Sequence, residues 1–440
     1  MEEKKSFWSL KPFDAKNALK FLAMSGVLSL FLGIIISIVA GALHITSLFS
    51  GDLVFSDYVE TISYCVCGNP YTGEPYNVHS IYPPFAYLPF YPFAWICKGD
   101  LIRYLEGSLP LERAYTAPSI LISYILFLLV NWTLVGLVMW RYSKKQGVDL
   151  AHLLIATFTF GPLLYCTGRG NVLIVCFLCG LVFFWLYDSP KRWQREMANL
   201  ALAAAVGIKI YPVILITLFL KDRRFLDLLK TLLYSLILLF LPFAIVEGGF
   251  GNIQAIWNNF HAFSGEGRGI DWSNISADGL AMKIRALFEL SGGDFSALGL
   301  WISRILRYGL LLTAIVLPIF SKKSEKKAAA VILAIGAYEL YQGVSYAYTM
   351  IYLLVPIVMT LNEWDTMERK DKWYYGVCFF LLSLSFPLFC KFAFPQSLVL
   401  MALVGKAIVD LIQDDLRLAK EGKAKAATEK EAEVSESVDR

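Results

Sequence analysis

Long apolar runs alternate along the chain with short polar segments, and most of the runs are long enough to cross a lipid bilayer as a helix. A helix needs about 20 mainly apolar residues to span the hydrocarbon core. The pattern predicts about ten transmembrane helices, at residues 21–43, 118–140, 150–166, 172–187, 225–246, 298–320, 328–343, 346–361, 373–390 and 397–412. We therefore expect an all-α polytopic membrane protein.

One further apolar stretch, residues 198–220, does not fit a single crossing. Basic clusters flank it at both ends, and Lys209 and Pro212 interrupt its middle. A segment that enters and leaves the membrane on the same side accounts for both features, because broken backbone at depth is tolerated where it lines a cavity. We predict a re-entrant helical hairpin here.

The spans place two long polar segments on the external side, residues 44–111 and residues 247–295. Within the first, residues 85–97 are rich in aromatic residues and proline, which is typical of interfacial or re-entrant helices. A basic N-terminal segment, residues 1–20, precedes the membrane domain of residues 21–413.

The last segment, residues 414–440, is mostly Ala, Glu and Lys with almost no large apolar residue. Such a composition cannot bury enough apolar surface to offset the entropy of ordering. We predict a disordered cytoplasmic tail.

The composition supports a membrane protein, and the distribution of charge indicates its orientation in the membrane. Hydrophobic residues make up 57% of the chain and charged residues 17%, whereas soluble domains are nearer a quarter charged. Lysine and arginine gather in short clusters that mark cytoplasmic ends by the positive-inside rule. These clusters lie at residues 4–20, 141–145, 191–195, 221–224, 322–327 and 369–372. We expect a multi-pass protein of the cell membrane with both termini cytoplasmic, and no nucleic-acid partner.

Three charged residues are candidates for chemistry. Asp57 follows the first span by a short distance, where a carboxylate can act as a general base toward an external hydroxyl. A single loop aspartate is more commonly a solvated acid or a helix N-cap. Lys209 lies at membrane depth, where an ionisable group is either functional or a structural partner for a nearby carbonyl or acid. Arg169 is either a phosphate-binding fork or an interfacial side chain that reaches water.

The cysteines and acids give no sign of a metal or cofactor. Cys65, Cys67 and Cys97 fall in the first external segment, so a disulfide among them remains open. No acidic pair of the D-x-D type lies in the external segments. We expect no metal and no cofactor.

Four motifs occur in order along the membrane part of the chain. The first external segment holds the early Asp57, then Gly68-Asn69-Pro70-Tyr71, then Tyr82-Pro83-Pro84. The later motifs are Gly168-Arg169-Gly170-Asn171; AAAVGIKIYP at residues 203–212; and Trp272-Ser273-Asn274-Ile275-Ser276, followed by Arg285. In this order they resemble the family 87, mannosyltransferase-like glycosyltransferases, which have the type C fold and use a polyprenyl-phosphate-sugar donor.

The resemblance spans roughly residues 21–361 and departs late in the chain. The family often has a histidine in the helix pair near residues 341–352, where this chain has Gln342, Ser345, Tyr346 and Tyr348. The way in which acceptor or phosphate is held there is therefore open.

The resemblance implies an inverting hexosyltransferase. A hexose, with mannose the first expectation, would pass from a polyprenyl-phosphate-sugar to a glycolipid or glycan acceptor at the external face. It assigns Asp57 the role of general base, and it implies that donor phosphate and substrate are bound by Lys209, Arg169, Asn171, Arg285, Asn274, Tyr82 and Tyr71. Arg268 is a further candidate cation in the second external segment.

Two functions from other classes remain alternatives. A transporter or a flippase for lipid-linked sugars would use the broken hairpin at Lys209 as its substrate site. A surface-polysaccharide polymerase or ligase would have its long external loop late in the chain rather than after the first span. The donor sugar, the acceptor, the linkage, the lipid length and the oligomeric state are not fixed by the sequence.

Overall fold

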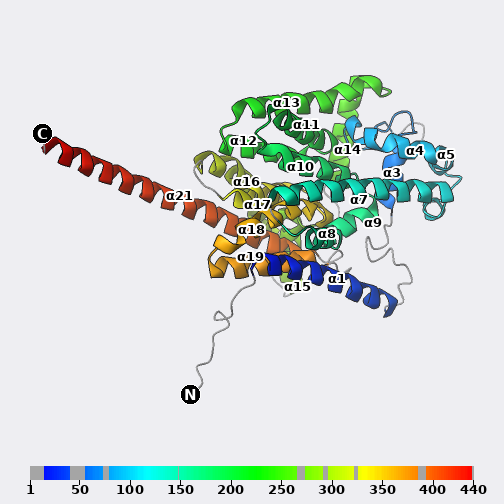
Figure 1. The fold of residues 1–440 in the computed structure, drawn as a ribbon. Helices are drawn as coiled ribbons and strands as arrows, with labels where there is room; N and C mark the ends of the chain where they lie inside the picture. Colours follow the sequence, from blue (N-terminus) through cyan, green and yellow to red (C-terminus); the bar gives the residue numbers. More distant parts are fainter. Residues whose placement is uncertain are drawn as a thin grey trace, which may run out of the picture.

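A computed structural model describes residues 14–39, 55–72, 79–146, 148–264, 273–290, 296–321, 326–384 and 393–438. Within these ranges the regular elements are α-helices, written α, and short 3₁₀ helices, written η (Figure 1). An isolated antiparallel bridge joins Asn274 and Tyr346. The described part of the chain therefore has the predicted all-α architecture.

The elements of the first half are α1 (Ala15–Val39), α3 (Ser56–Tyr64), η2 (Pro84–Phe90), α4 (Tyr91–Ile96), α5 (Lys98–Leu105), α6 (Leu111–Ala114), α7 (Pro118–Gln146), α8 (Leu150–Phe158), α9 (Gly161–Arg169) and α10 (Leu173–Tyr187). Those of the second half are α11 (Arg192–Ile208), η3 (Tyr211–Ile216), α12 (Thr217–Lys221), α13 (Phe225–Phe240), η4 (Leu241–Ile245), η5 (Gly249–Gly251), α14 (Asn252–Ser264), α15 (Ala277–Leu290), α16 (Ser296–Phe320), α17 (Lys327–Tyr341), η6 (Ala347–Leu353), α18 (Leu354–Glu363), η7 (Trp364–Thr366), α19 (Arg369–Ser383) and α21 (Phe394–Val438).

Several helices are long and apolar enough to cross a membrane, which confirms the polytopic prediction. In the described ranges, five helices meet both criteria over Ala15–Ile35, Pro118–Lys144, Phe225–Ile245, Trp301–Phe320 and Phe394–Gly422. Helices α8 and α9 meet the criteria only when taken together, and they are bent by 51° relative to each other. The other predicted spans fall on shorter or interrupted helices, so the count of ten stays a prediction.

The helix α17 lies at the centre of the packing. Its residues 328–340 are all buried, and it contacts α16, α18, α21 and η3. Small side chains let its neighbours approach closely, as is common between membrane helices. At Gly336 an added Cβ would lie 2.1 Å from the Val404 side chain of α21, so only glycine fits this crossing.

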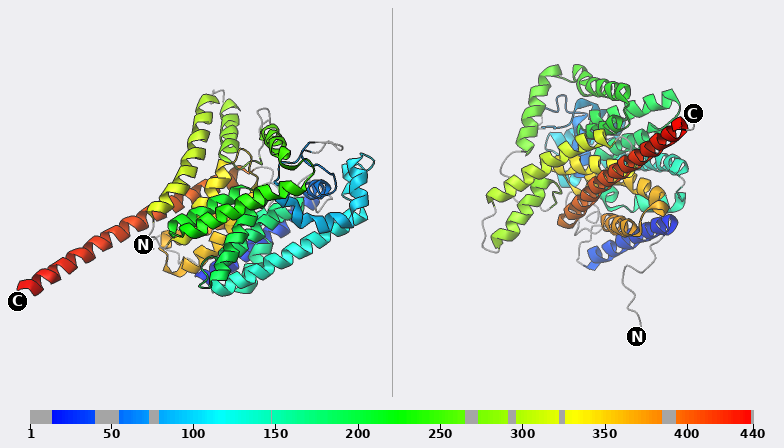
Figure 2. Two further views of the ribbon diagram at one scale, coloured as in Figure 1. Left: turned by 90° about the horizontal axis from the view of Figure 1, so that it is seen from above. Right: turned by 90° about the vertical axis from the view of Figure 1, so that its left-hand side faces the viewer.

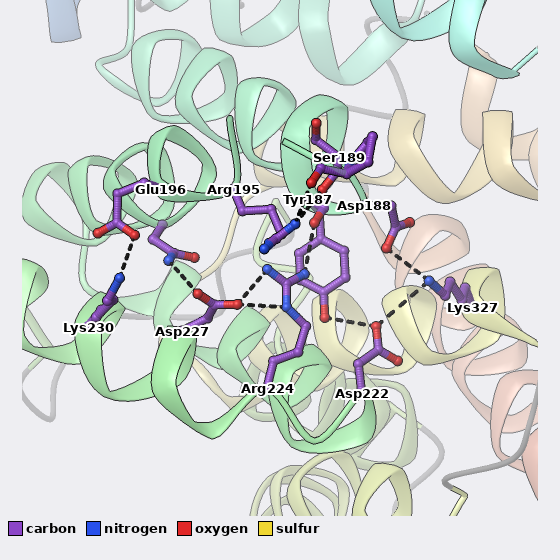
Figure 3. Close-up of polar contacts among 12 residues, drawn as sticks. Tyr187, Asp188, Ser189, Arg195, Glu196, Asp222, Arg224, Asp227, Lys230 and Lys327 are labelled. Carbon is purple, nitrogen blue, oxygen red and sulfur yellow. Dashed lines mark hydrogen bonds and ion pairs between the residues drawn. The ribbon is translucent and has the colours of Figure 1, made fainter. Parts of the chain in front are cut away.

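The stretch from α11 to α12 folds back on itself as a helical hairpin, and its re-entry into the membrane stays a prediction. Tyr187, at the end of α10, donates a hydrogen bond to Asp222, just past α12, at 3.0 Å. Lys327 at the start of α17 contacts Asp188 at 3.1 Å and Asp222 at 3.7 Å (Figure 3). The entry and the exit of the segment therefore meet at one end of the helix bundle.

Further contacts at this end tie α11 to α13. Asn199 donates to Asp227 at 3.0 Å, and Lys230 donates to Glu196 at 2.7 Å (Figure 3). The hairpin turns at Lys209, where the backbone is extended, with φ −143° and ψ 128°. The cluster of charges thus lies at the open end of the hairpin, and Lys209 lies at its tip.

Residues 85–97 of the first external segment, predicted to be interfacial or re-entrant helix, are almost entirely helical. Helices η2, α4 and α5 occupy residues 84–105, and α3 precedes them. Hydrogen bonds of three asparagines join this segment to the second external segment. Asn69 donates to Asn252 at 3.0 Å, and Asn259 donates to the carbonyl oxygens of Tyr71 and Ser80, both at 3.0 Å. The cysteines at positions 65, 67 and 97 are free.

Helix α21 continues to Val438 and projects from the helical body, as Figures 1 and 2 show. The expectation of a disordered cytoplasmic tail over residues 414–440 stays a prediction. Ala, Glu and Lys are strong helix formers. The helix is also anchored in the bundle, because Leu400, Leu403 and Leu411 are buried. The first 13 residues lie outside the described ranges.

Candidate active site

The Asp57 carboxylate is held by a two-pronged ion pair. Arg169 donates from Nε to Oδ2 at 2.7 Å and from Nη2 to Oδ1 at 2.5 Å. Both side chains are 13% exposed. Asp57 lies in the first turn of α3, which begins after Phe55 with a left-handed φ of 54°. The residue is therefore neither a solvated loop acid nor a helix N-cap.

The turn after α9 brings a second donor to the same carboxylate. Asn171 donates from Nδ2 to Asp57 Oδ2 at 2.6 Å, while its own Oδ1 accepts from the Leu173 amide at 2.9 Å. Gly170 between Arg169 and Asn171 has a φ of +63°, which favours glycine. An added Cβ at Gly170 would lie 2.5 Å from the Tyr58 side chain. The G-R-G-N motif thus builds a clamp for Asp57.

Lys209 stands at the tip of the hairpin among aromatic rings. Its Nζ lies 5.4 Å from the ring centre of Tyr82, 5.6 Å from Tyr211 and 5.8 Å from Tyr348. Ammonium groups are attracted to such rings by the ring quadrupole. No hydrogen bond or ion pair from the described residues reaches this Nζ. The rings therefore stabilise a cation that retains donors for an anionic ligand.

One tyrosine ring links Lys209 to the Asp57 clamp. The Arg169 guanidinium lies 5.9 Å from the centre of the Tyr348 ring, which Lys209 also contacts. Tyr348 is 7% exposed and fixed in η6. The clamp and the lysine thus adjoin the same buried ring, and together with Tyr82 they form one cluster.

A cavity of about 610 Å³ opens beside this cluster. Its lining is mainly apolar and aromatic, with Ile214 from η3, Leu311 from α16, and Phe260 and Phe263 from α14. Two cationic side chains reach it, those of Lys209 and Arg307. A mostly apolar pocket with a few placed charges is the usual form of a small-molecule site.

Arg307 lines the cavity and was not among the predicted site residues. It donates to Asp278 Oδ2 at 2.6 Å and to the Tyr341 carbonyl at 2.8 Å, and it lines the cavity from α16. An arginine inside an apolar helix is the signal that points to it, because charges are rare in such segments.

Asn274 holds the cavity wall in place through the hydrogen bonds of its side chain. Its Nδ2 donates to the Gly343 carbonyl at 3.0 Å, and its Oδ1 accepts from the amides of Ser276 and Ser345, each at 3.0 Å. The buried Lys283 donates to its carbonyl at 2.6 Å. Asn274 thereby fixes the break between α17 and η6.

The remaining predicted residues lie around the cavity or away from it. Tyr82 lines it, while Tyr71 is 1% exposed and supports Tyr82 by donating to its carbonyl at 3.0 Å. Arg285 is exposed on α15 and is not among the lining residues. Arg268 lies outside the described residues. The structure thus gathers Asp57, Arg169, Asn171, Lys209 and Tyr82.

The sequence was compared with models of known protein families. The family model of glycosyltransferase family 87 matches residues 81–340, more than half of the 440 residues. The chain belongs to glycosyltransferase family 87. It is therefore a glycosyltransferase, and its apolar helices make it a membrane protein. A comparison with curated proteins returns no match.

The family 87 match contains most of the cluster but begins after Asp57. Arg169, Asn171 and Lys209 lie inside the matched range, as does Tyr82, whereas Asp57 precedes it. The clamp joins the two parts, because Arg169 and Asn171 within the match hold the carboxylate outside it.

A buried acid occupies the region where this chain departs from the resemblance to family 87. Glu339 in α17 is fully buried, and its Oε2 accepts hydrogen bonds from Ser345 at 2.6 Å and from Thr349. These bonds hold the segment that carries Tyr348. The sequence reasoning listed Ser345 and Tyr348 in this region but missed Glu339.

A second acid, Glu60, lies one turn beyond Asp57 on α3. Burial of its carboxyl group among protein atoms raises the pKa of Glu60, and the charge of Asp57 adds to the effect. The sequence gives no signal for this property, which depends on the fold around α3.

No group of three or more metal-ligating side chains is found within the ranges that the structure describes. The expectation of chemistry without a metal or cofactor stays a prediction.

Proposed function

We propose that this family 87 glycosyltransferase transfers a hexose, mannose in the first instance, from a polyprenyl-phosphate-sugar to a hydroxyl of a glycolipid or glycan acceptor. The reaction takes place at the external face of the cell membrane and inverts the anomeric configuration. The observation that supports this most is the junction between the Asp57 clamp and an apolar cavity that contains two cations.

The cavity suits a lipid phosphate. Apolar side chains such as Ile214 and Leu311 offer a path for an isoprenoid chain, and Lys209 and Arg307 offer charge for a phosphate. A phosphate in an apolar site requires such partners, because an unpaired buried charge is very costly. Lys209 is the first candidate, since Arg307 is already paired with Asp278.

Asp57 acts as the general base in this mechanism. It takes the proton from the acceptor hydroxyl as that oxygen attacks the anomeric carbon from the face opposite the lipid phosphate. The new carbon–oxygen bond forms while the bond to the phosphate oxygen breaks, and its electron pair leaves with the lipid phosphate. Lys209 stabilises the charge that develops there.

The clamp leaves a defined position for the acceptor hydroxyl. A carboxylate has about four lone-pair positions. Arg169 and Asn171 occupy three with contacts of 2.5 to 2.7 Å, and Ser56 makes the longest contact, at 3.4 Å to Oδ1. The acceptor hydroxyl replaces Ser56 at Oδ1, while the arginine fork keeps the carboxylate oriented.

The direct test of this function uses defined donors. The purified full chain in lipid nanodiscs is given synthetic polyprenyl-phosphate-mannose, polyprenyl-phosphate-glucose or GDP-mannose, each with EDTA and a glycolipid extract of the native membrane. We expect transfer from the polyprenyl-phosphate-mannose and none from the nucleotide sugar. Transfer from the nucleotide sugar alone would contradict the proposal, and faster transfer from the glucose donor would contradict the choice of mannose.

A further inference from the structure

A second cleft, of about 330 Å³, lies near the far end of α3, between the first external segment and the turn that follows α13. Four aromatic side chains and two charged ones line it: Tyr64, Tyr87, Tyr91, Trp95, Lys98 and Glu247. The larger cavity has none of these lining residues. It is therefore a separate site with its own chemistry.

The aromatic rings of this cleft are accessible. Trp95 is 71% exposed and Tyr91 is 38% exposed, while Tyr87 is buried beneath them. Lys98 places its Nζ 5.3 Å from the centre of the Trp95 ring. Exposed rings beside charges match a sugar, whose apolar C–H face lies against the negative face of a ring while its hydroxyls bond to charged groups.

Glu247 presents a carboxylate to this cleft. The described residues make no hydrogen bond or ion pair to that carboxylate, so its oxygens are available to ligand hydroxyls. Gly68 lies directly against it, since an added Cβ there would fall 2.8 Å from Glu247 Oε2. Glycine at this turn, where φ is +56°, thus allows the carboxylate to approach the aromatic wall.

Hydrogen bonds hold the wall that carries Glu247 in place. Asn252 donates to the Glu247 carbonyl at 2.7 Å and accepts from Asn69 at 3.0 Å. Gly248 has a φ of +88°, and an added Cβ would lie 2.7 Å from Asn69 Nδ2. These contacts link the two external segments, so the cleft is a fixed feature of the fold.

The cleft lies on the same helix as the proposed base. Asp57, Glu60 and Tyr64 are spaced at i, i+3 and i+7, which puts them on one face of α3. Seven residues of helix correspond to about 10 Å along its axis. A sugar bound at Tyr64 would therefore lie about 10 Å from Asp57 along one helix face, with Glu60 between them.

We propose that this cleft binds a sugar residue of the acceptor glycan, beyond the sugar whose hydroxyl is glycosylated. The proposal rests on the proposed function, and it makes the acceptor a saccharide of at least two units. Tyr91 and Trp95 stack on the sugar ring, and Glu247 and Lys98 bond to its hydroxyls. Binding there presents the reacting hydroxyl to Asp57.

Direct binding tests the cleft without requiring activity. Isothermal titration of the full chain in nanodiscs uses soluble mannotriose, maltotriose and galactotriose as probes. We expect one of them to bind, and Tyr91→Ala and Glu247→Gln to weaken its binding about tenfold. Tyr91→Phe keeps the ring and should retain binding. Trp193→Ala, which removes a 62% exposed ring on α11, is the matched control and should bind as the parent does.

Steady-state kinetics then test the role in the reaction. We expect the two weakening variants to raise the KM for the acceptor about tenfold and to leave the KM for the donor unchanged. An anchoring role for these aromatic residues in the membrane interface would instead leave the KM for the acceptor unchanged and lower the folded yield.

The outcomes separate this inference from the proposed function. If the parent binds a trisaccharide in the cleft but transfers no sugar from any lipid-phosphate donor, the proposed function fails and the saccharide site stands. If the parent transfers sugar and the variants keep the parent's KM for the acceptor, the inference is overturned. Failure of all three probes to bind would overturn it as well.

Discussion

The carboxylate of Asp57 accepts hydrogen bonds from Arg169 and Asn171, and these bonds determine its orientation and its stability. The pair is only 13% exposed, so an unpartnered carboxylate would be strongly disfavoured there. Arginine fixes both oxygens at once, which lysine cannot do with its single point charge. At the scale of the residue, then, the clamp both stabilises the acid and aims it.

Removing one partner of the clamp tests its energetic role. We expect Arg169→Leu to lower the free energy of unfolding by about 3–5 kcal/mol, because it leaves the Asp57 charge unpaired. Asp57→Asn combined with Arg169→Leu should recover part of that loss. Arg103→Leu, which breaks an ion pair with Asp100 whose arginine side chain is 58% exposed, is the control with little effect. Denaturant unfolding in detergent measures all four proteins.

A double variant no more stable than Arg169→Leu alone would show that the charge of Asp57 is not what the arginine balances.

The Lys209 ammonium is predicted to act on the leaving phosphate. We expect Lys209→Met to lower kcat by about 10²–10³, as is typical when one donor to a developing charge is removed. Lys209→Arg should retain part of the activity. Lys230→Met is the control, because Lys230 pairs with Glu196 at the opposite end of the hairpin. An unchanged kcat in Lys209→Met would assign charge stabilisation to another group, with Arg307 the first candidate.

At the scale of the element, the turn between α9 and α10 sets the clamp. Its G-R-G-N motif is visible in the sequence, but its partner in α3 is not, because more than a hundred residues separate Asp57 from Arg169. The left-handed conformation of Gly170 lets the two side chains that flank it reach one carboxylate. The break at Lys209 is also readable, since a lysine and a proline interrupt an apolar run there.

Substituting Gly170 tests this turn. We expect Gly170→Ala to reduce transfer and to lower the unfolding temperature, because its φ is +63° and the new Cβ would meet Tyr58 at 2.5 Å. The shift moves Arg169 and Asn171 away from Asp57. Gly251→Ala, where an added Cβ has open space, is the matched control. Equal melting temperatures and rates for Gly170→Ala and the parent would contradict the tight turn.

The contacts of several other residues could not be predicted from the sequence. The side chains of Asn274 and Tyr71 hold the cavity wall and Tyr82, and their expected role in binding substrate stays a prediction. Arg307 and Glu339 were missed, since their roles come from contacts between helices that are distant in sequence. Local patterns thus locate breaks and turns, while the partners of each polar side chain follow only from packing.

At the scale of the whole molecule, the basic clusters predict the orientation in the membrane. Both ends of the hairpin meet at one end of the bundle, where Arg195, Arg224 and Lys230 also lie (Figure 3). Lysine and arginine favour the cytoplasmic side. The number of crossings was harder to predict, because short helices such as α17 and α18 are joined by breaks that line the cavity.

Cysteine labelling tests this orientation. In a chain whose eight native cysteines are replaced, Lys191→Cys and Arg223→Cys should react with an impermeant thiol reagent only from the cytoplasmic side. Glu247→Cys should react only from the outside. Labelling of positions 191 and 223 from opposite sides would contradict the re-entrant hairpin.

The central claim is that Asp57 is the base that activates the acceptor. The most direct measurement compares the parent with Asp57→Asn at matched expression, in transfer from a synthetic polyprenyl-phosphate-mannose with EDTA present. Glu106→Gln, an exposed acid of the same external segment, is the control. We predict that Asp57→Asn lowers transfer by about 10²–10⁴-fold and that the control transfers at the parent's rate. Full activity in Asp57→Asn would place the base elsewhere and contradict the account.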